Sequence, residues 1–118
     1  MAATYKDLNF DEGDDFPYVV TVIDGDSAAV DLTGYTFYMT VKEKLSDSDD
    51  QAIFKKTVTS IPSPTLGIVT ITIDRADTQN KTPGIYPYDI KYKSDTSTVR
   101  TLLYGKFKMT QAITDSVA

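Results

Sequence analysis

The sequence contains no cysteine, no histidine and no tryptophan. Without cysteine the chain has neither disulfides nor thiolate metal ligands, so its stability must come from packing or assembly. Without histidine it lacks the usual general base at neutral pH, the Ser-His and Cys-His nucleophile pairs and the commonest zinc ligand. The absence of these residues excludes most enzyme classes. We therefore expect a protein that is not an enzyme and uses no cofactor.

Long apolar runs and an excess of basic residues are also missing. No stretch approaches the roughly 20 apolar residues of a membrane-spanning helix, and the N-terminus carries no run of signal-peptide length. The formal net charge of the 118 residues is −5, which repels phosphate backbones. We therefore expect synthesis in the cytoplasm, with neither a membrane nor nucleic acid as a partner.

The residues that are abundant favour β-structure. Hydrophobic residues make up 41% of the chain and charged residues 25%, the composition of one globular domain. Many of the apolar residues are β-branched or aromatic, and they alternate with polar ones within short runs such as residues 35–44 and 67–74. Turn residues separate these runs, and no segment is long enough for a crossover helix. The sequence predicts an all-β, antiparallel β-sandwich of about seven strands.

Individual segments refine this prediction. Residues 52–59 resemble an edge strand, because two consecutive lysines discourage pairing with other chains. Residues 74–81 favour one helical turn that is too short to pack as a helix. Residues 86–93 alternate tyrosines and an isoleucine with charged residues or proline, and a turn at 94–97 predicts a hairpin with residues 98–110.

The two ends of the chain are more polar. We interpret residues 1–12 as an N-terminal arm, residues 13–110 as the sandwich and residues 111–118 as a C-terminal tail. Tyr5, Leu8 and Phe10 are scattered apolar residues that the arm cannot bury against itself. We expect this arm to become ordered only on a partner, which makes the three residues interface candidates.

The acidic residues and the tyrosines each allow two interpretations. Carboxylates at Asp24 and Asp26, or within residues 47–50, could supply oxygen ligands to calcium, but solvated turns explain them better, so we predict no metal. Tyr38 lies on the polar face of its predicted strand. It is an interface candidate, with an ordinary cross-strand pair as the alternative.

Three motifs occur in a recognisable order. Residues 30–37 read VDLTGYTF, residues 67–74 read GIVTITID, and residues 82–90 read TPGIYPYDI. This series resembles the N-terminal immunoglobulin-like domain of phage baseplate upper proteins, with related domains in other small phage tail and head-fibre proteins. The resemblance covers residues 13–110 and implies an immunoglobulin-like sandwich in the virion. Its implied partners are other virion proteins of the tail, baseplate or capsid, with several copies per particle.

The last motif also has a direct physical interpretation. Pro83 and Gly84 form a tight entry that would aim Tyr86 inward. In immunoglobulin-like sandwiches a tyrosine at this corner bonds the backbone upstream. The alternative is that Tyr86 and Tyr88 are simply core aromatics.

A second function class remains open at this stage. Exposed tyrosines could stack on sugars, which would make the chain a carbohydrate-binding module used for adhesion to a host surface. That function requires about three coplanar aromatic rings on one exposed face, whereas docking in a virion requires a protein-sized patch.

Overall fold

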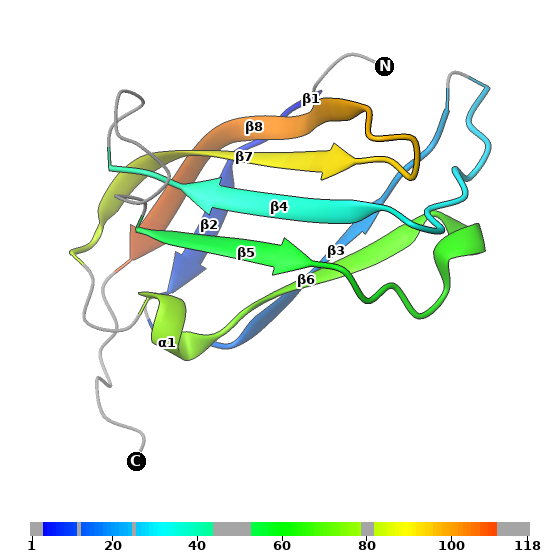
Figure 1. The fold of residues 1–118 in the computed structure, drawn as a ribbon. Helices are drawn as coiled ribbons and strands as arrows, with labels where there is room; N and C mark the ends of the chain where they lie inside the picture. Colours follow the sequence, from blue (N-terminus) through cyan, green and yellow to red (C-terminus); the bar gives the residue numbers. More distant parts are fainter. Residues whose placement is uncertain (1–3, 12, 25, 44–52, 79–81, 111–118) are drawn as a thin grey trace.

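The computed structural model of the chain describes residues 4–11, 13–24, 26–43, 53–78 and 82–110. Within these ranges the chain forms eight strands, a 3-10 helix and one short α-helix (Figure 1). The elements are β1 (Thr4–Tyr5), β2 (Leu8–Asp11), β3 (Phe16–Thr21), β4 (Thr36–Val41), β5 (Phe54–Val58), η2 (Pro64–Leu66), β6 (Ile68–Ile73), α1 (Arg75–Thr78), β7 (Gly84–Lys93) and β8 (Val99–Thr110).

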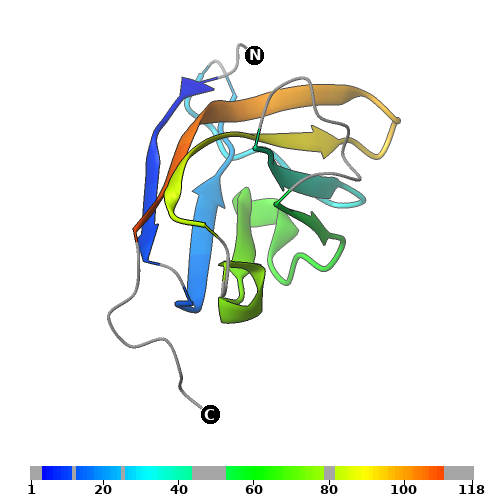
Figure 2. The same ribbon diagram turned by 90° about the vertical axis from the view of Figure 1, so that its left-hand side faces the viewer.

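The strands form two sheets. The larger sheet has the order β1-β8-β7-β4-β5, and β2 also pairs with β8. The smaller sheet contains β3 and β6, which pair antiparallel. It packs against one face of the larger sheet (Figures 1 and 2). The prediction of an all-β sandwich is confirmed.

The core fills the space between the two sheets, as the period-two patterns predict. Along β6, Val69, Ile71 and Ile73 are buried while the residues between them are exposed. Phe37 and Met39 of β4 face them from the larger sheet and are fully buried. Burial of apolar surface of this kind is the main favourable term in folding.

The N-terminal segment belongs to the sandwich, so its interpretation as a free arm is wrong. β1 and β2 pair with β8 in parallel, which also makes the larger sheet mixed rather than purely antiparallel. Leu8 and Phe10 lie in the core, with 6% and 7% of their surface exposed. The Phe10 ring stacks on that of Phe107, with centroids 4.7 Å apart. Leu8 and Phe10 are thus buried within the chain's own sandwich and not against a partner, whereas Tyr5 is exposed. The expected tail, residues 111–118, lies outside the described residues.

Two smaller predictions are also confirmed. β5 is the edge strand of the larger sheet. One of its two lysines, Lys56, reaches back to α1, where its ammonium group lies 3.0 Å from Asp74 and 2.7 Å from Asp77. α1 is the short helical turn expected in this region.

β7 and β8 form the predicted hairpin, with one irregularity. Ile90 pairs with Leu103 and Lys91 pairs with Thr101, so Leu102 is an extra residue on β8. Such a bulge bends the strand and increases its twist. Figure 2 shows the hairpin curving strongly around the smaller sheet. This curvature shapes the outer face of the larger sheet.

Tyr88 ties this hairpin to the N-terminal strands. Its hydroxyl donates a hydrogen bond of 2.5 Å to the carbonyl oxygen of Lys6, between β1 and β2. Burial raises the pKa of the Tyr88 hydroxyl well above its usual value. The neutral phenol is therefore favoured in the folded chain, whereas the unfolded chain ionises with the ordinary pKa of 10.0.

We expect the stabilisation by Tyr88 to be complete below pH 10 and to be lost as the pH rises above it. Tyr88→Phe should cost about 0.5–1.5 kcal/mol at neutral pH, because the hydrogen bond is removed. Above pH 10 the melting temperature of the variant should fall less steeply than that of the wild type. Thermal melts between pH 7 and 11 check this, with Tyr104→Phe as the exposed control. Parallel pH profiles of wild type and Tyr88→Phe would contradict the assignment.

Candidate functional site

A broad groove of about 970 Å³ lies on the outer face of the larger sheet. Residues from β1, β4, β5, β7 and β8 line it. Alternate residues of each strand, such as Asp89, Lys91 and Lys93 of β7, point outward on this face because side chains alternate between the two faces of a strand. Tyr38 of β4 is paired with Lys91 of β7, and Tyr5 of β1 is paired with Tyr104 of β8, so all four share this face. The groove therefore collects residues that are far apart in the sequence.

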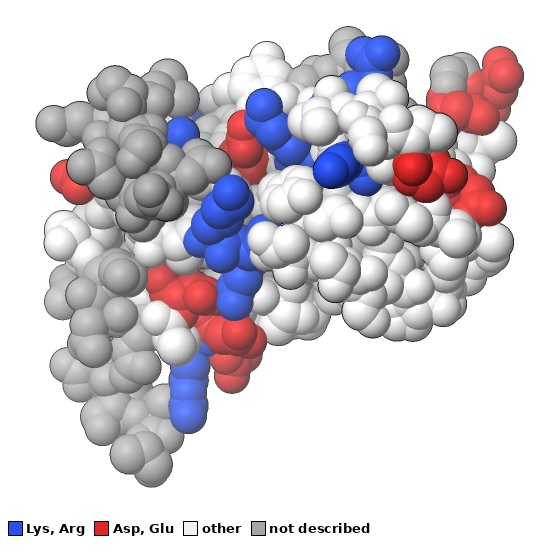
Figure 3. Space-filling model, in the orientation of Figure 1, with Lys and Arg blue, Asp and Glu red and all other residues white. Residues whose placement is uncertain are grey.

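The groove is basic, although the protein is acidic. Among the described lining residues the carboxylates are Glu43 and Asp89. The described lysines of the groove are Lys42, Lys55, Lys91, Lys93 and Lys106. The described lining thus has a formal charge of +3, against −5 for the whole chain. Figure 3 shows basic side chains distributed across this face. Such a local excess attracts acidic partners despite the overall charge.

Aromatic and apolar side chains lie between the lysines. The Tyr5 and Tyr104 rings meet edge to face, with centroids 5.3 Å apart and an interplanar angle of 82°. A hydrogen bond with Asp7 raises the pKa of the Tyr5 hydroxyl. The Lys55 ammonium lies 5.7 Å from the centroid of the Tyr38 ring, a cation–π contact. Val99 also lines the groove and is 56% exposed.

The structure separates the four predicted interface residues into two pairs. Tyr5 and Tyr38 both line the groove. Leu8 and Phe10 lie in the core, because they face the smaller sheet and not solvent. Leu8 and Phe10 alternate with polar residues, a period-two signal that could have identified β2, although it is only four residues long.

Sequence reasoning missed Tyr104 and the gathering of lysines. Tyr104 could not be assigned to a face, because the extra residue Leu102 shifts the period of β8. Lys91 and Lys93 were expected on a solvated face, and both are exposed. That they line the same groove as Lys106 depends on the register of the hairpin, which local patterns do not reveal.

The acidic residues considered as metal ligands have other roles where the structure describes them. One carboxylate oxygen of Asp24 accepts hydrogen bonds from the backbone N–H groups of Asp26 and Ala28, at 2.8 and 3.0 Å. This is the local turn chemistry of aspartate. Residues 47–50 lie outside the described residues. Within the described ranges no group of three or more acidic residues could hold a metal ion.

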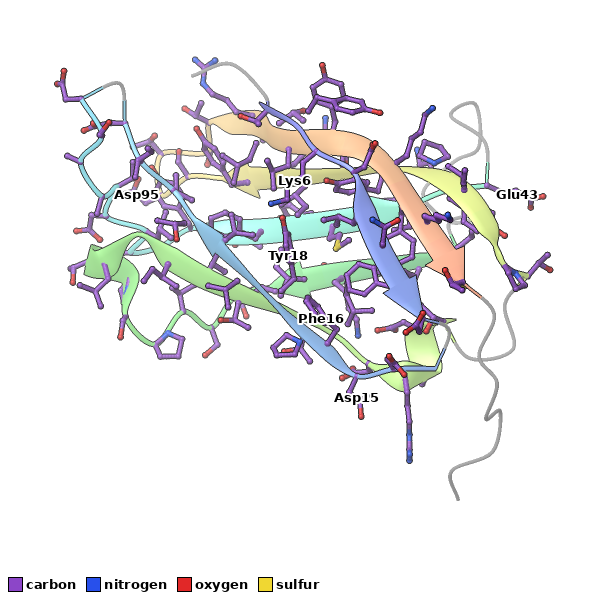
Figure 4. The ribbon with its side chains drawn as sticks, turned by 180° about the vertical axis from the view of Figure 1, so that it is seen from behind. Lys6, Asp15, Phe16, Tyr18, Glu43 and Asp95 are labelled. Carbon is purple, nitrogen blue, oxygen red and sulfur yellow. The ribbon has the colours of Figure 1, made fainter. Side chains whose placement is uncertain are left out.

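A second hollow, of about 410 Å³, lies where β3 approaches β1 and β8. Lys6 and Tyr18 are among its lining residues, and Figure 4 shows both from behind. Among the described residues that line it, Lys6 alone is charged. This hollow therefore lacks the cluster of lysines that distinguishes the groove.

No model of a protein family and no curated sequence matches the chain. In the part of the chain that the structure describes, no helix is long and apolar enough to cross a membrane. Any function must therefore be argued from the groove and the fold.

Proposed function

We propose that the chain is an accessory structural protein of a phage particle, with an immunoglobulin-like domain that attaches to the tail, baseplate or capsid surface. In this proposal it docks a neighbouring virion protein through the groove on its larger sheet. The groove carries the proposal, because it combines lysines, exposed tyrosines and an exposed valine on one protein-sized face. Tyrosines are enriched at protein interfaces, where their rings bury apolar area and their hydroxyls remain solvated.

The strand pairing supports an immunoglobulin-like domain. β3 pairs with β6 in one sheet, and β4, β7 and β8 are neighbours in the other. This is the division expected when these strands are B and E in one sheet and C, F and G in the other.

The corner before β7 supports it as well. The hydroxyl of Tyr86, near the start of that strand, donates a hydrogen bond to the carbonyl oxygen of Thr82, four residues upstream. This contact matches the tyrosine corner of immunoglobulin-like sandwiches. It also lies inside the motif at residues 82–90 that resembles the phage domain.

Carbohydrate binding is the weaker candidate on this geometry. Stacking on sugars would need several coplanar exposed rings, but the Tyr5 and Tyr104 rings are close to perpendicular. The ring of Tyr38 already has the Lys55 ammonium over it. Protein docking does not require coplanar rings, so the groove fits a protein partner better.

Mass spectrometry of purified phage particles tests this proposal. We expect the chain to be present at a fixed copy number relative to the major capsid protein, and to remain after washing at physiological salt together with the other tail or capsid components. Absence from washed particles would contradict a virion role. Glycan binding by the isolated chain that Tyr104→Ala abolishes would favour the adhesion module instead.

A further inference from the structure

We infer that the groove binds the acidic end of a second copy of this chain, so that copies assemble head to tail. This inference rests on the proposed function, because it names the partner of the same face. Its starting point is the uneven distribution of charge over the molecule.

The acidic end comprises four aspartates in the turns at one end of the sandwich: Asp24, Asp26, Asp31 and Asp95. All four are exposed. Asp95 lies at the opposite end of the molecule from Glu43 (Figure 4). Acidic side chains gather at the right-hand end of the view in Figure 3, beside the turn between β7 and β8. This end therefore offers negative charge that matches the lysines of the groove.

Local hydrogen bonds hold this end in a defined shape. Asp31 accepts hydrogen bonds from the backbone N–H and the hydroxyl of Thr33, at 3.0 and 2.6 Å. Asp95 packs against the same turn, since a Cβ added to Gly34 would lie 2.9 Å from the Cβ of Asp95. The two residues thus flank one turn, and the hydrogen bonds from Thr33 reduce the conformational entropy that the Asp31 side chain has left to lose when a partner contacts it.

Both surfaces also carry apolar residues. Exposed ion pairs alone contribute little, so a docking contact needs apolar area as well. Ile23, next to Asp24, is 47% exposed, and Tyr104 in the groove is 45% exposed. Each surface therefore combines charge of one sign with an exposed apolar side chain. The groove and the acidic end are therefore opposite in charge, and each offers an apolar side chain to the contact.

Charge also decides the symmetry of the contact. A twofold dimer that joins groove to groove would oppose lysines of both copies, which like-charge repulsion disfavours. A contact between the groove and the acidic end joins two different surfaces. Such heterologous contacts produce rings or open chains of copies. We expect a series of oligomers rather than a single dimer.

Sedimentation velocity of the full chain tests this inference, with three variants. K91E/K93E changes the formal charge of the described groove lining from +3 to −1, and D24K/D26K/D95K changes that of the four aspartates of the acidic end from −4 to +2. R75E/K108E is a control outside the groove lining with the same charge change as K91E/K93E. Wild type and control should form concentration-dependent oligomers at low salt that dissociate at high salt. Each of the other two variants should associate at least about tenfold more weakly, about 1.4 kcal/mol. Circular dichroism melts serve as the control that all variants are folded.

The decisive sample is an equimolar mixture of K91E/K93E and D24K/D26K/D95K. The reversed groove of one variant complements the reversed end of the other, so mixing should restore the oligomers. A monomeric wild type at all concentrations, or association that K91E/K93E leaves unchanged, would overturn the head-to-tail contact. The virion role is tested separately by particle composition: a chain that is monomeric in solution but present at fixed copy number in particles rejects this inference alone.

Discussion

Phe10→Ala is expected to lower the free energy of unfolding by about 3–5 kcal/mol. The Phe10 side chain is 7% exposed, stacks on Phe107 and meets the ring of Phe16 edge to face, with centroids 4.9 Å apart. Its removal leaves a cavity where β2 packs over the core. A loss of this size is a large part of the roughly 5–15 kcal/mol that stabilises an ordinary domain. Urea denaturation followed by circular dichroism measures it.

Asn9→Ala is the matched control for this prediction. Asn9 lies on the same strand, but its side chain faces solvent. Its replacement should change stability by no more than about 0.5 kcal/mol. If Phe10→Ala were as mild as Asn9→Ala, the N-terminal segment would be a free arm after all, and its pairing with β8 would be wrong.

Gly105→Ala should destabilise the protein by about 3 kcal/mol. A Cβ at this position would lie 2.2 Å from the carbonyl oxygen of Lys6 and 2.8 Å from its carbonyl carbon. Backbone cannot give way as a flexible side chain can, so β1 must move away from β8. That movement also weakens the hydrogen bond from the Tyr88 hydroxyl to Lys6.

Lys106→Ala is the neighbouring control, since Lys106 is exposed and its side chain points into the groove. We expect a change within about 0.5 kcal/mol. Amide hydrogen exchange locates the effect: in Gly105→Ala the protection of β1 and the adjoining part of β8 should fall first. Unchanged stability of Gly105→Ala would show that β1 does not approach β8 this closely.

Local patterns were sufficient to predict most of the sandwich. The alternation of Val69, Ile71 and Ile73 with threonines predicts β6 and its buried face, and both are confirmed. The turn at residues 94–97 predicts the β7–β8 hairpin. In each case the signal lies within a few residues, because strand periodicity and turn preferences are local properties.

The N-terminal strands could not be predicted in the same way. Leu8 pairs with Phe107, which lies almost at the other end of the described chain. Parallel pairing of chain ends leaves no hairpin turn as a signal. The polar composition of residues 1–12 therefore outweighed the short alternation around Leu8 and Phe10.

The candidate site was predicted only in part for a related reason. Tyr38 was assigned to an outer face from the alternation within its own strand, and the groove confirms that placement. Tyr5 also lines the groove, but as part of β1 and not of a free arm. The basic character of the face depends largely on lysines of β5, β7 and β8. These lysines share one face only because of the register between these strands and β4. Net charge conceals such a patch, because it averages opposite surfaces.

Lysine labelling is the most direct test that the groove is the docking face. The chain is treated with an amine-reactive ester, once as the free protein and once within purified particles, and each lysine is quantified by mass spectrometry. If the groove is the docking face, Lys91, Lys93 and Lys106 should be strongly protected from the ester in particles, while Lys108, outside the groove lining, should keep its reactivity. Equal reactivity of the three groove lysines in the free and particle-bound chain would contradict it.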